Sequence, residues 1–237
     1  MKVSLISYTM NPLDTVYIGA RTCYHAGCSD ELKELAKTLP EEKKIKFVQG
    51  VIKSGHLSVT EHVNFTFAID EISRMASEQL LRHRHTSPSV RSFRYTTIKE
   101  DKNMLRNASN EQLVEIMQKY VVGVDAKNAR HYAEELAFYL EELEKGVKPE
   151  DARNLLPMGT KTSMVDTFNL RELMHICNER LCTRAQAEIR EGIKQMKKEV
   201  VGVAPWVEPY LVPKCGINGI CNERQSCGLY KIFQKQR

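Results

Sequence analysis

The sequence has no long apolar run, because polar residues interrupt every hydrophobic stretch. A membrane-spanning helix needs about 20 consecutive apolar residues, so none is expected. Residues 1–8 lack the apolar core and the cleavage site of a secretory signal peptide and resemble a first strand instead. These absences predict a protein of the cytoplasm without a membrane partner.

Two common motifs are also missing. No cysteine pair has CxxC spacing, and no GxGxxG occurs, so a Rossmann turn for a dinucleotide is excluded. The seven cysteines of a cytoplasmic chain stay reduced unless they bind metal or do chemistry. The formal charge of +5 is compatible with anionic ligands but too small to require nucleic acid.

Local patterns predict an α/β protein of the α+β type, with a small, mostly antiparallel sheet surrounded by many helices. Residues 1–202 are expected to form one domain, and residues 203–237 an irregular tail that contains cysteines. Strands are expected at 2–8, 63–69, 95–98 and 160–168. Helices are expected at 11–24, from 29, and at 40–54, 72–81, 109–123, 125–146, 149–157, 169–182 and 185–201.

Residues 82–94 form the most distinctive segment, with four arginines, two histidines and four hydroxyl side chains. Guanidinium groups bind phosphate in a bidentate fashion, and hydroxyls add further donors. A solvated basic loop, a nucleic-acid arm and a phosphorylatable loop are the plainer interpretations. The mixture of residue types, and its place between a predicted strand–helix unit and a return strand, favours an active-site loop.

Two further segments carry candidate chemistry. Residues 55–62 contain His56, Glu61 and His62, but their spacing fits no zinc helix motif, and a structural pair is the better interpretation of the last two. On the helix expected from 169, Arg171 and His175 lie about 40° apart, and Arg180 lies about 140° beyond His175. One helix serving two ligand regions or two subunits would show this pattern, as would ordinary surface polarity.

In order along the chain, these segments resemble the flavin-dependent thymidylate synthase family. The family signature is Arg-His-Arg, two residues, Ser, and then Ser-x-Arg-Tyr. Here it is matched by Arg82-His83-Arg84, Ser87 and Ser92-Phe93-Arg94-Tyr95. The resemblance extends to Ala20-Arg21-Thr22-Cys23-Tyr24, Gly55–His62, Glu150-x-x-Arg153 and Asn169–Arg190, and so covers most of residues 1–200.

The resemblance implies an enzyme that methylates dUMP to dTMP, with FAD as cofactor and with NADPH and methylenetetrahydrofolate as co-substrates. It implies a homotetramer whose sites combine loops from several subunits, with no resident metal and no nucleic-acid partner. Arg82, His56 and Arg180 take catalytic positions. The flavin positions are His56, Ser58, Arg82, His83, Arg84, Asn169, Arg171 and His175. The nucleotide positions are Gln79, Arg82, Ser92, Arg94, Glu150, Arg153 and Arg180.

The implied chemistry fits the residue types. FAD and dUMP are phosphate anions, for which arginines are the expected binders. The classical route to dTMP uses a cysteine nucleophile, yet no cysteine lies in the matching site motifs, and Cys177 and Cys182 are expected to be structural. Instead, Arg180 is expected to face the pyrimidine and favour its anionic form. Ser92 is expected to position the nucleotide rather than to attack it.

The sequence departs from the family pattern at Pro88, Val90 and Arg91, so Arg91 is a candidate for a substituted nucleotide contact. The tail cysteines match no family motif. They fit either a zinc site that lacks its fourth ligand or, as the preferred interpretation, unpaired reduced thiols. These cysteines are Cys215, Cys221 and Cys227.

Two other functions compete with this interpretation. A nucleic-acid-binding protein would use residues 82–94 as a basic arm, but aromatics make up only 7% of the chain, and Phe93 and Tyr95 are the only ones near that arm. A metal hydrolase would bind its ion through four side chains whose spacing gives little support. These are His56, Glu61, His62 and His83.

Overall fold

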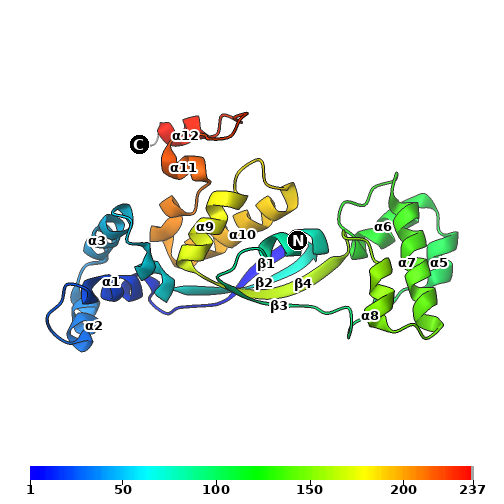
Figure 1. Cartoon of the computed structure of the whole chain (residues 1–237), viewed down its shortest axis with the longest axis horizontal. Helices are drawn as coiled ribbons and strands as arrows, with labels where there is room; N and C mark the ends of the chain where they lie inside the picture. The colour runs from blue at the N-terminus through cyan, green and yellow to red at the C-terminus, as the bar shows by residue number, and fades with distance from the viewer. Residues whose placement is uncertain (236–237) are drawn as a thin grey trace. The chain divides into compact units, whose positions relative to one another are not determined.

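The computed structural model describes residues 1–235. They form two compact units, whose elements are labelled in Figure 1. Unit 1 comprises residues 1–2, 69–82 and 89–165, and unit 2 comprises residues 3–68, 83–88 and the described chain from Asp166 onward. All four strands of the sheet described next have residues in both units.

Four strands of the described chain form one sheet in the order β1-β2-β4-β3. They are β1 (Lys2–Tyr8), β2 (Asn64–Ser73), β3 (Thr86–Val90) and β4 (Lys161–Asn169). The N–H of Thr9 donates to the carbonyl of Asn64 at 3.0 Å, and the N–H of Arg91 donates to that of Ser163 at 2.9 Å. Each bond joins the end of one strand to the beginning of its neighbour, so the strands are antiparallel. The predicted α+β class with a small antiparallel sheet is confirmed.

Unit 2 holds the helices of both ends of the described chain. They are α1 (Pro12–Thr22), α2 (Ser29–Thr38), α3 (Glu41–Lys53), η1 (Leu57–His62), α9 (Leu170–Arg180), α10 (Ala187–Val203), η3 (Pro205–Tyr210), α11 (Lys214–Asn218) and α12 (Tyr230–Gln234). Helix α9 packs against η1, α10 and α11 (Figure 1). It begins where the side-chain oxygen of Asn169 accepts the N–H of Glu172 at 2.8 Å, a standard N-cap bond.

Unit 1 contains α4 (Arg74–Leu80), α5 (Lys102–Asn107), α6 (Asn110–Tyr120), α7 (Ala129–Glu144), α8 (Pro149–Ala152) and η2 (Arg153–Leu155). Ser109 and Gln112 form a capping box at the start of α6, because the side chain of each bonds the backbone N–H of the other. Helix α7 packs against α5 and α6 (green in Figure 1). Leu113, Met117 and Tyr139 are buried in this core.

The return strand lies earlier than the sequence predicts. The strand expected at 95–98 is absent from the described chain; instead residues 86–90 form β3, and Tyr95 and Thr96 turn back to the carbonyl of Ser92. Pro88 is tolerated because β3 is an edge strand of the sheet. Asn11 is the N-cap residue of α1 and has a φ of 51°, but its side chain makes no cap hydrogen bond.

The segment after Gly202 contains η3, α11 and α12, so its described part is not irregular as predicted. Trp206 and Val207 are buried. Residues 236–237 of the predicted tail lie outside the described residues, and the division at 202/203 stays a prediction. In the part of the chain that the structure describes, no helix combines the length and the apolar character that crossing a membrane requires.

Candidate functional site

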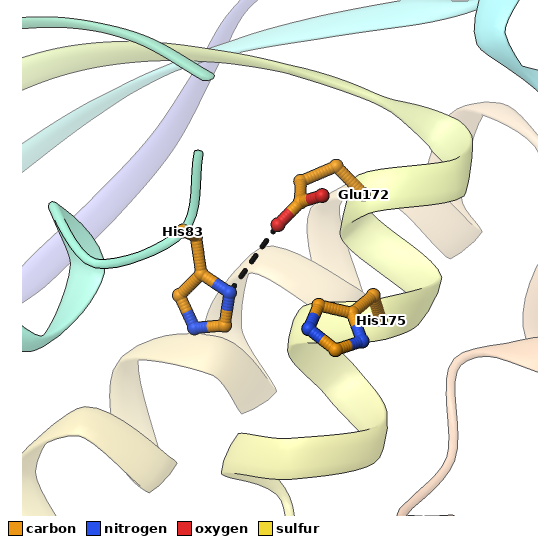
Figure 2. Close-up of side chains that lie close together, drawn as sticks. All are labelled: His83, Glu172 and His175. Atoms are coloured by element: carbon orange, nitrogen blue, oxygen red, sulfur yellow. Dashed lines mark ion pairs between the residues drawn. The ribbon is translucent and has the colours of Figure 1, made fainter. Parts of the chain in front are cut away.

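A hydrogen-bonded chain in unit 2 links Glu172, His83 and Arg180. Glu172 and His175 project from α9 toward His83, which follows α4 in the chain (Figure 2). Nδ1 of His83 lies 3.3 Å from Oε1 of Glu172, and Nε of Arg180 donates to Nε2 of His83 at 3.2 Å. The rings of His83 and His175 meet edge to face, with centroids 5.6 Å apart. Both Glu172 and His83 are buried.

These contacts fix the protonation of His83. An arginine N–H can only donate, so Nε2 of His83 is the acceptor and the ring proton sits on Nδ1, facing Glu172. Burial and the adjacent Arg180 guanidinium lower the pKa of His83 below its ordinary value. The imidazole is therefore neutral at pH 7 and holds the arginine through a lone pair.

The four side chains that the metal-hydrolase alternative requires do not form one ligand group in the described residues. Within residues 1–235, one group of His, Cys, Asp or Glu side chains has ligand atoms close enough for a metal ion, namely His83, Glu172 and His175. It excludes His56, Glu61 and His62. Both ring nitrogens of His83 are already engaged by Arg180 and Glu172, which leaves no lone pair there for a metal.

The predicted flavin residues fall in unit 2, except for Arg82. Helix α9 packs against η1, and Arg171 forms an ion pair of 2.5 Å with Glu61 across that contact. Most of the set is solvent-exposed, whereas His83 is buried and Asn169 is part-buried because it caps α9. The exposed members are His56, Ser58, Arg82, Arg84, Arg171 and His175.

The predicted nucleotide residues fall in unit 1, except for Arg180. Arg94 pairs with Glu150 at 3.2 Å, and Nε of Arg153 donates to the carbonyl of Glu150 at 3.1 Å. The hydroxyl of Ser92 accepts the N–H of Arg94 at 3.2 Å. The structure thus brings four of the predicted residues into one cluster. Gln79 and Arg82 lie at the end of the α4 segment of the same unit.

Arg91 occupies a structural position. Its Nη2 donates to the carbonyl of Lys161 at 2.5 Å, and its guanidinium stacks over Phe93 at 5.0 Å. Lys161 begins β4, and Phe93 is buried in the core of unit 1. The substituted nucleotide contact suggested for Arg91 would have to compete with these bonds.

Sequence reasoning missed two residues. Glu172 holds His83, and the one available indication was its place one helical turn before His175. Arg74 lines a cavity of about 270 Å³ together with Arg153, and its guanidinium lies 5.9 Å from the ring of Phe93. The resemblance assigns no ligand to either residue, and both reach their partners only through the tertiary fold.

Two further buried groups bear on the chemistry. Cys177 is fully buried on α9, and burial raises the pKa of its thiol to about 12, as expected for a structural cysteine. Cys177 is therefore not expected to act as a nucleophile.

Asp166 on β4 is buried opposite Thr86, and burial raises the pKa of its carboxyl to about 6.

Known proteins resemble this chain over nearly its whole length. The family described as "Thymidylate synthase complementing protein" matches residues 4–206. Flavin-dependent thymidylate synthases of Clostridium tetani and Geobacter sulfurreducens are each 37% identical, over 96% of this chain and 93% and 94% of their own. The solved flavin-dependent thymidylate synthase of Helicobacter pylori, complexed with FAD and dUMP, is 24% identical, with a TM-score of 0.74 over 90% of this chain and 100% of its own. This last likeness bears on the fold alone.

Proposed function

This chain belongs to the flavin-dependent thymidylate synthase family, and on that premise we propose that it methylates dUMP to dTMP with methylenetetrahydrofolate as the one-carbon donor and NADPH as the reductant. It is an enzyme of the transferase class, with FAD as its cofactor. The observation that carries the proposal is the match through residues 4–206, which includes every predicted site residue.

The donor set of unit 2 fits a flavin dinucleotide. Arg171, Arg84 and His175 are exposed cationic or hydrogen-bonding groups, and Glu61 is the carboxylate that pairs with Arg171. A pyrophosphate in place of Glu61 would gain charge-assisted bonds to the same guanidinium. We assign flavin binding to His56, Ser58, Arg82, His83, Arg84, Asn169, Arg171 and His175.

The cluster of unit 1 fits a nucleoside monophosphate. Arg94 is half-exposed and can turn from Glu150 to a phosphate, while Ser92 offers a hydroxyl beside it. Arg153 and Arg74 line the adjacent cavity. We assign dUMP binding to Gln79, Arg82, Ser92, Arg94, Glu150, Arg153 and Arg180.

Arg180 is the proposed catalytic group for the pyrimidine. Methylation at C5 requires an electron-rich uracil, and a positioned guanidinium stabilises the anionic form of the ring. Neutral His83 fixes the Nε side of Arg180, and Glu172 fixes His83 in turn. Arg82 and His56 are the further proposed catalytic residues, and both belong to the set assigned to the flavin. When bound, the reduced flavin supplies the hydride.

The proposed reaction uses no enzyme cysteine as a nucleophile. Nucleophilic attack requires a thiolate, and the buried Cys177 thiol, with a pKa of about 12, stays protonated. In unit 2, Arg180 and His83 thus provide electrostatic activation where the classical route uses sulfur. We further propose a cytoplasmic homotetramer in which loops from several subunits complete each site.

An absorbance spectrum tests the cofactor, and product analysis tests the reaction. The purified protein should be yellow and should release FAD on denaturation. With dUMP, methylenetetrahydrofolate and NADPH it should form dTMP, detected by chromatography. A colourless protein that cannot be reconstituted with FAD, or a yellow one that forms no dTMP, would contradict the proposal.

A further inference from the structure

A basic pocket of about 390 Å³ lies in unit 1, and no residue assigned to FAD or dUMP lines it. Its volume lies in the range of small-molecule sites. Four cationic side chains line the pocket together with one carboxylate, that of Glu71, and with several hydroxyl groups. The cations are Arg91, Lys99, Lys119 and Lys161, and the hydroxyl side chains are Thr96, Thr97, Tyr120, Thr162 and Ser163.

The carboxylate of Glu71 does not neutralise the cations of the pocket. Oε1 of Glu71 pairs with Nζ of Lys2 at 2.7 Å, and its Oε2 lies 3.6 Å from Nζ of Lys161. Lys99 and Lys119 are exposed, and no carboxylate of residues 1–235 pairs with either. The pocket therefore keeps an excess of positive charge, which raises the local concentration of anions.

Two of the cations are held in place by uncharged groups. Nη2 of Arg91 donates to the carbonyl of Lys161 at 2.5 Å, and its guanidinium stacks over Phe93 at 5.0 Å. Nζ of Lys161 donates to the carbonyl of Gln118 at 2.6 Å, near the end of α6. These contacts fix the two side chains but leave their charge in place. Cations that are already ordered lose less conformational entropy when they bind an anion.

The backbone of Glu71 is strained. Its φ is 56°, and Asn11 is the one other non-glycine residue of the described chain with a positive φ. This conformation is sterically costly for a residue with a side chain, and such strain is concentrated at ligand-binding sites. Glu71 also stands beside Lys161 in the pocket wall, so the strained residue and an ordered cation belong to the same feature.

We propose that this pocket binds a small molecule with linked phosphate groups, as a ligand site separate from those assigned to FAD and dUMP. One carboxylate needs a single guanidinium fork, whereas linked phosphates present oxygens to several cations at once. Arg91 supplies the fork, the lysines act as point charges, and the hydroxyl groups add donors. Arg91 is also a position where the sequence departs from the family pattern, so the family reaction does not require its charge.

Two kinds of nucleotide carry this chemistry. A nicotinamide dinucleotide contains a pyrophosphate and would enter as the reductant, whereas a nucleoside triphosphate would enter as an effector. Phe93 lines both this pocket and the cavity of Arg74 and Arg153. A ligand in the pocket would therefore share a wall with the region proposed for dUMP, through which it could act on that region.

The test is calorimetric titration of the full-length chain with inorganic pyrophosphate. FAD and dUMP are present in excess to fill the assigned phosphate sites, and about 0.15 M salt screens nonspecific attraction. The wild type should bind pyrophosphate at one saturable site per chain. The double variant Lys99→Ala/Lys119→Ala should bind at least about tenfold more weakly, because it removes two charged donors. Both lysines are exposed, so the variant should fold.

The matched control is Lys127→Ala/Lys198→Ala, which removes the same charge from two exposed lysines outside the pocket and should bind like wild type. Titration with NADP⁺ and with dTTP then identifies the source, which is the tighter ligand of the two. No saturable pyrophosphate binding by the wild type, or equal affinities in the two double variants, would overturn the proposal. The readout is binding, and the substitutions avoid the residues assigned to FAD and dUMP, so the result does not depend on thymidylate formation.

Discussion

Arg180 and His83 are joined by a hydrogen bond of 3.2 Å from Nε to Nε2, and this bond makes the imidazole an acceptor. The bond holds the Nε side of the Arg180 guanidinium against His83. It also requires a neutral His83, which burial and the arginine itself promote by lowering the pKa of His83. The predictions below start from this pair.

Glu172→Ala should lower kcat for dTMP formation about tenfold while changing KM for dUMP less, because His83 loses the acceptor for its Nδ1 proton. Glu172→Gln should recover most of the rate, since the glutamine carbonyl can accept the same proton. Steady-state kinetics of the FAD-loaded variants provide the measurement. Equal losses in the two variants would argue that Glu172 serves only the packing of α9.

Arg180→Ala should lower dTMP formation at least about 100-fold, because it removes the group proposed to stabilise the anionic uracil. Bound FAD and the melting temperature should stay close to wild type. Turnover at fixed enzyme and FAD concentration is the quantity to compare. Unchanged turnover would remove Arg180 from the catalytic role.

Arg171→Ala should weaken FAD binding about tenfold or more, through the loss of a charge-assisted bond to phosphate. Lys198→Ala is the matched control: it removes one exposed cation from α10, away from the predicted set, and should bind FAD like wild type. Fluorescence titration of the apoprotein with FAD gives both dissociation constants. Similar affinities for the two variants would contradict the flavin assignment on α9.

Asp166 should make the folded state less stable as the pH rises. Its pKa is raised from the ordinary 3.8 to about 6 in the fold, so the neutral form is favoured. The contribution of Asp166 to the free energy of unfolding is fully present below about pH 4 and is lost as the pH passes 6. The free energy of unfolding falls by on the order of 2–3 kcal/mol over this range.

Asp166→Asn mimics the neutral acid and should remove that part of the pH dependence. Urea unfolding of both proteins at a series of pH values gives the comparison. The variant should gain stability relative to wild type as the pH increases from about 4 to 7. A constant difference across this range would mean that Asp166 titrates normally.

Cys177→Ala should keep turnover within about twofold of wild type, because a buried thiol with a pKa of about 12 supplies no nucleophile. The measurement is the initial rate of dTMP formation. The melting temperature of the variant shows how far the small cavity left by the substitution destabilises the fold. Loss of activity in a folded, FAD-loaded variant would restore a thiolate mechanism.

The elements that the sequence predicted well are those with local determinants. The period-two burial of Phe65 and Phe67, the capping box at Ser109 and the N-cap at Asn169 all act within a few residues. Strand β3 escaped prediction because Ser87-Pro88-Ser89 has no strand pattern; pairing with β4 alone makes it a strand.

The sequence names a candidate set of site residues, which stays a prediction, but it does not show the contacts between them. The family resemblance names His83 and Arg180, but their separation of 97 residues hides the bond between them. Glu172 gains its partner in the same nonlocal way, because His83 comes from the loop after α4. Residue spacing along one helix cannot reveal either contact. Spacing shows which residues share a face of the helix, but it does not show which residues pack against that face.

The most direct measurement of the central claim is tritium release from dUMP labelled at C5 of the uracil. The FAD-loaded wild-type chain should release tritium to water when methylenetetrahydrofolate and NADPH are present, and Arg180→Ala should release at least about 100-fold less. No release from the FAD-loaded wild type, or equal release from both proteins, would contradict the account.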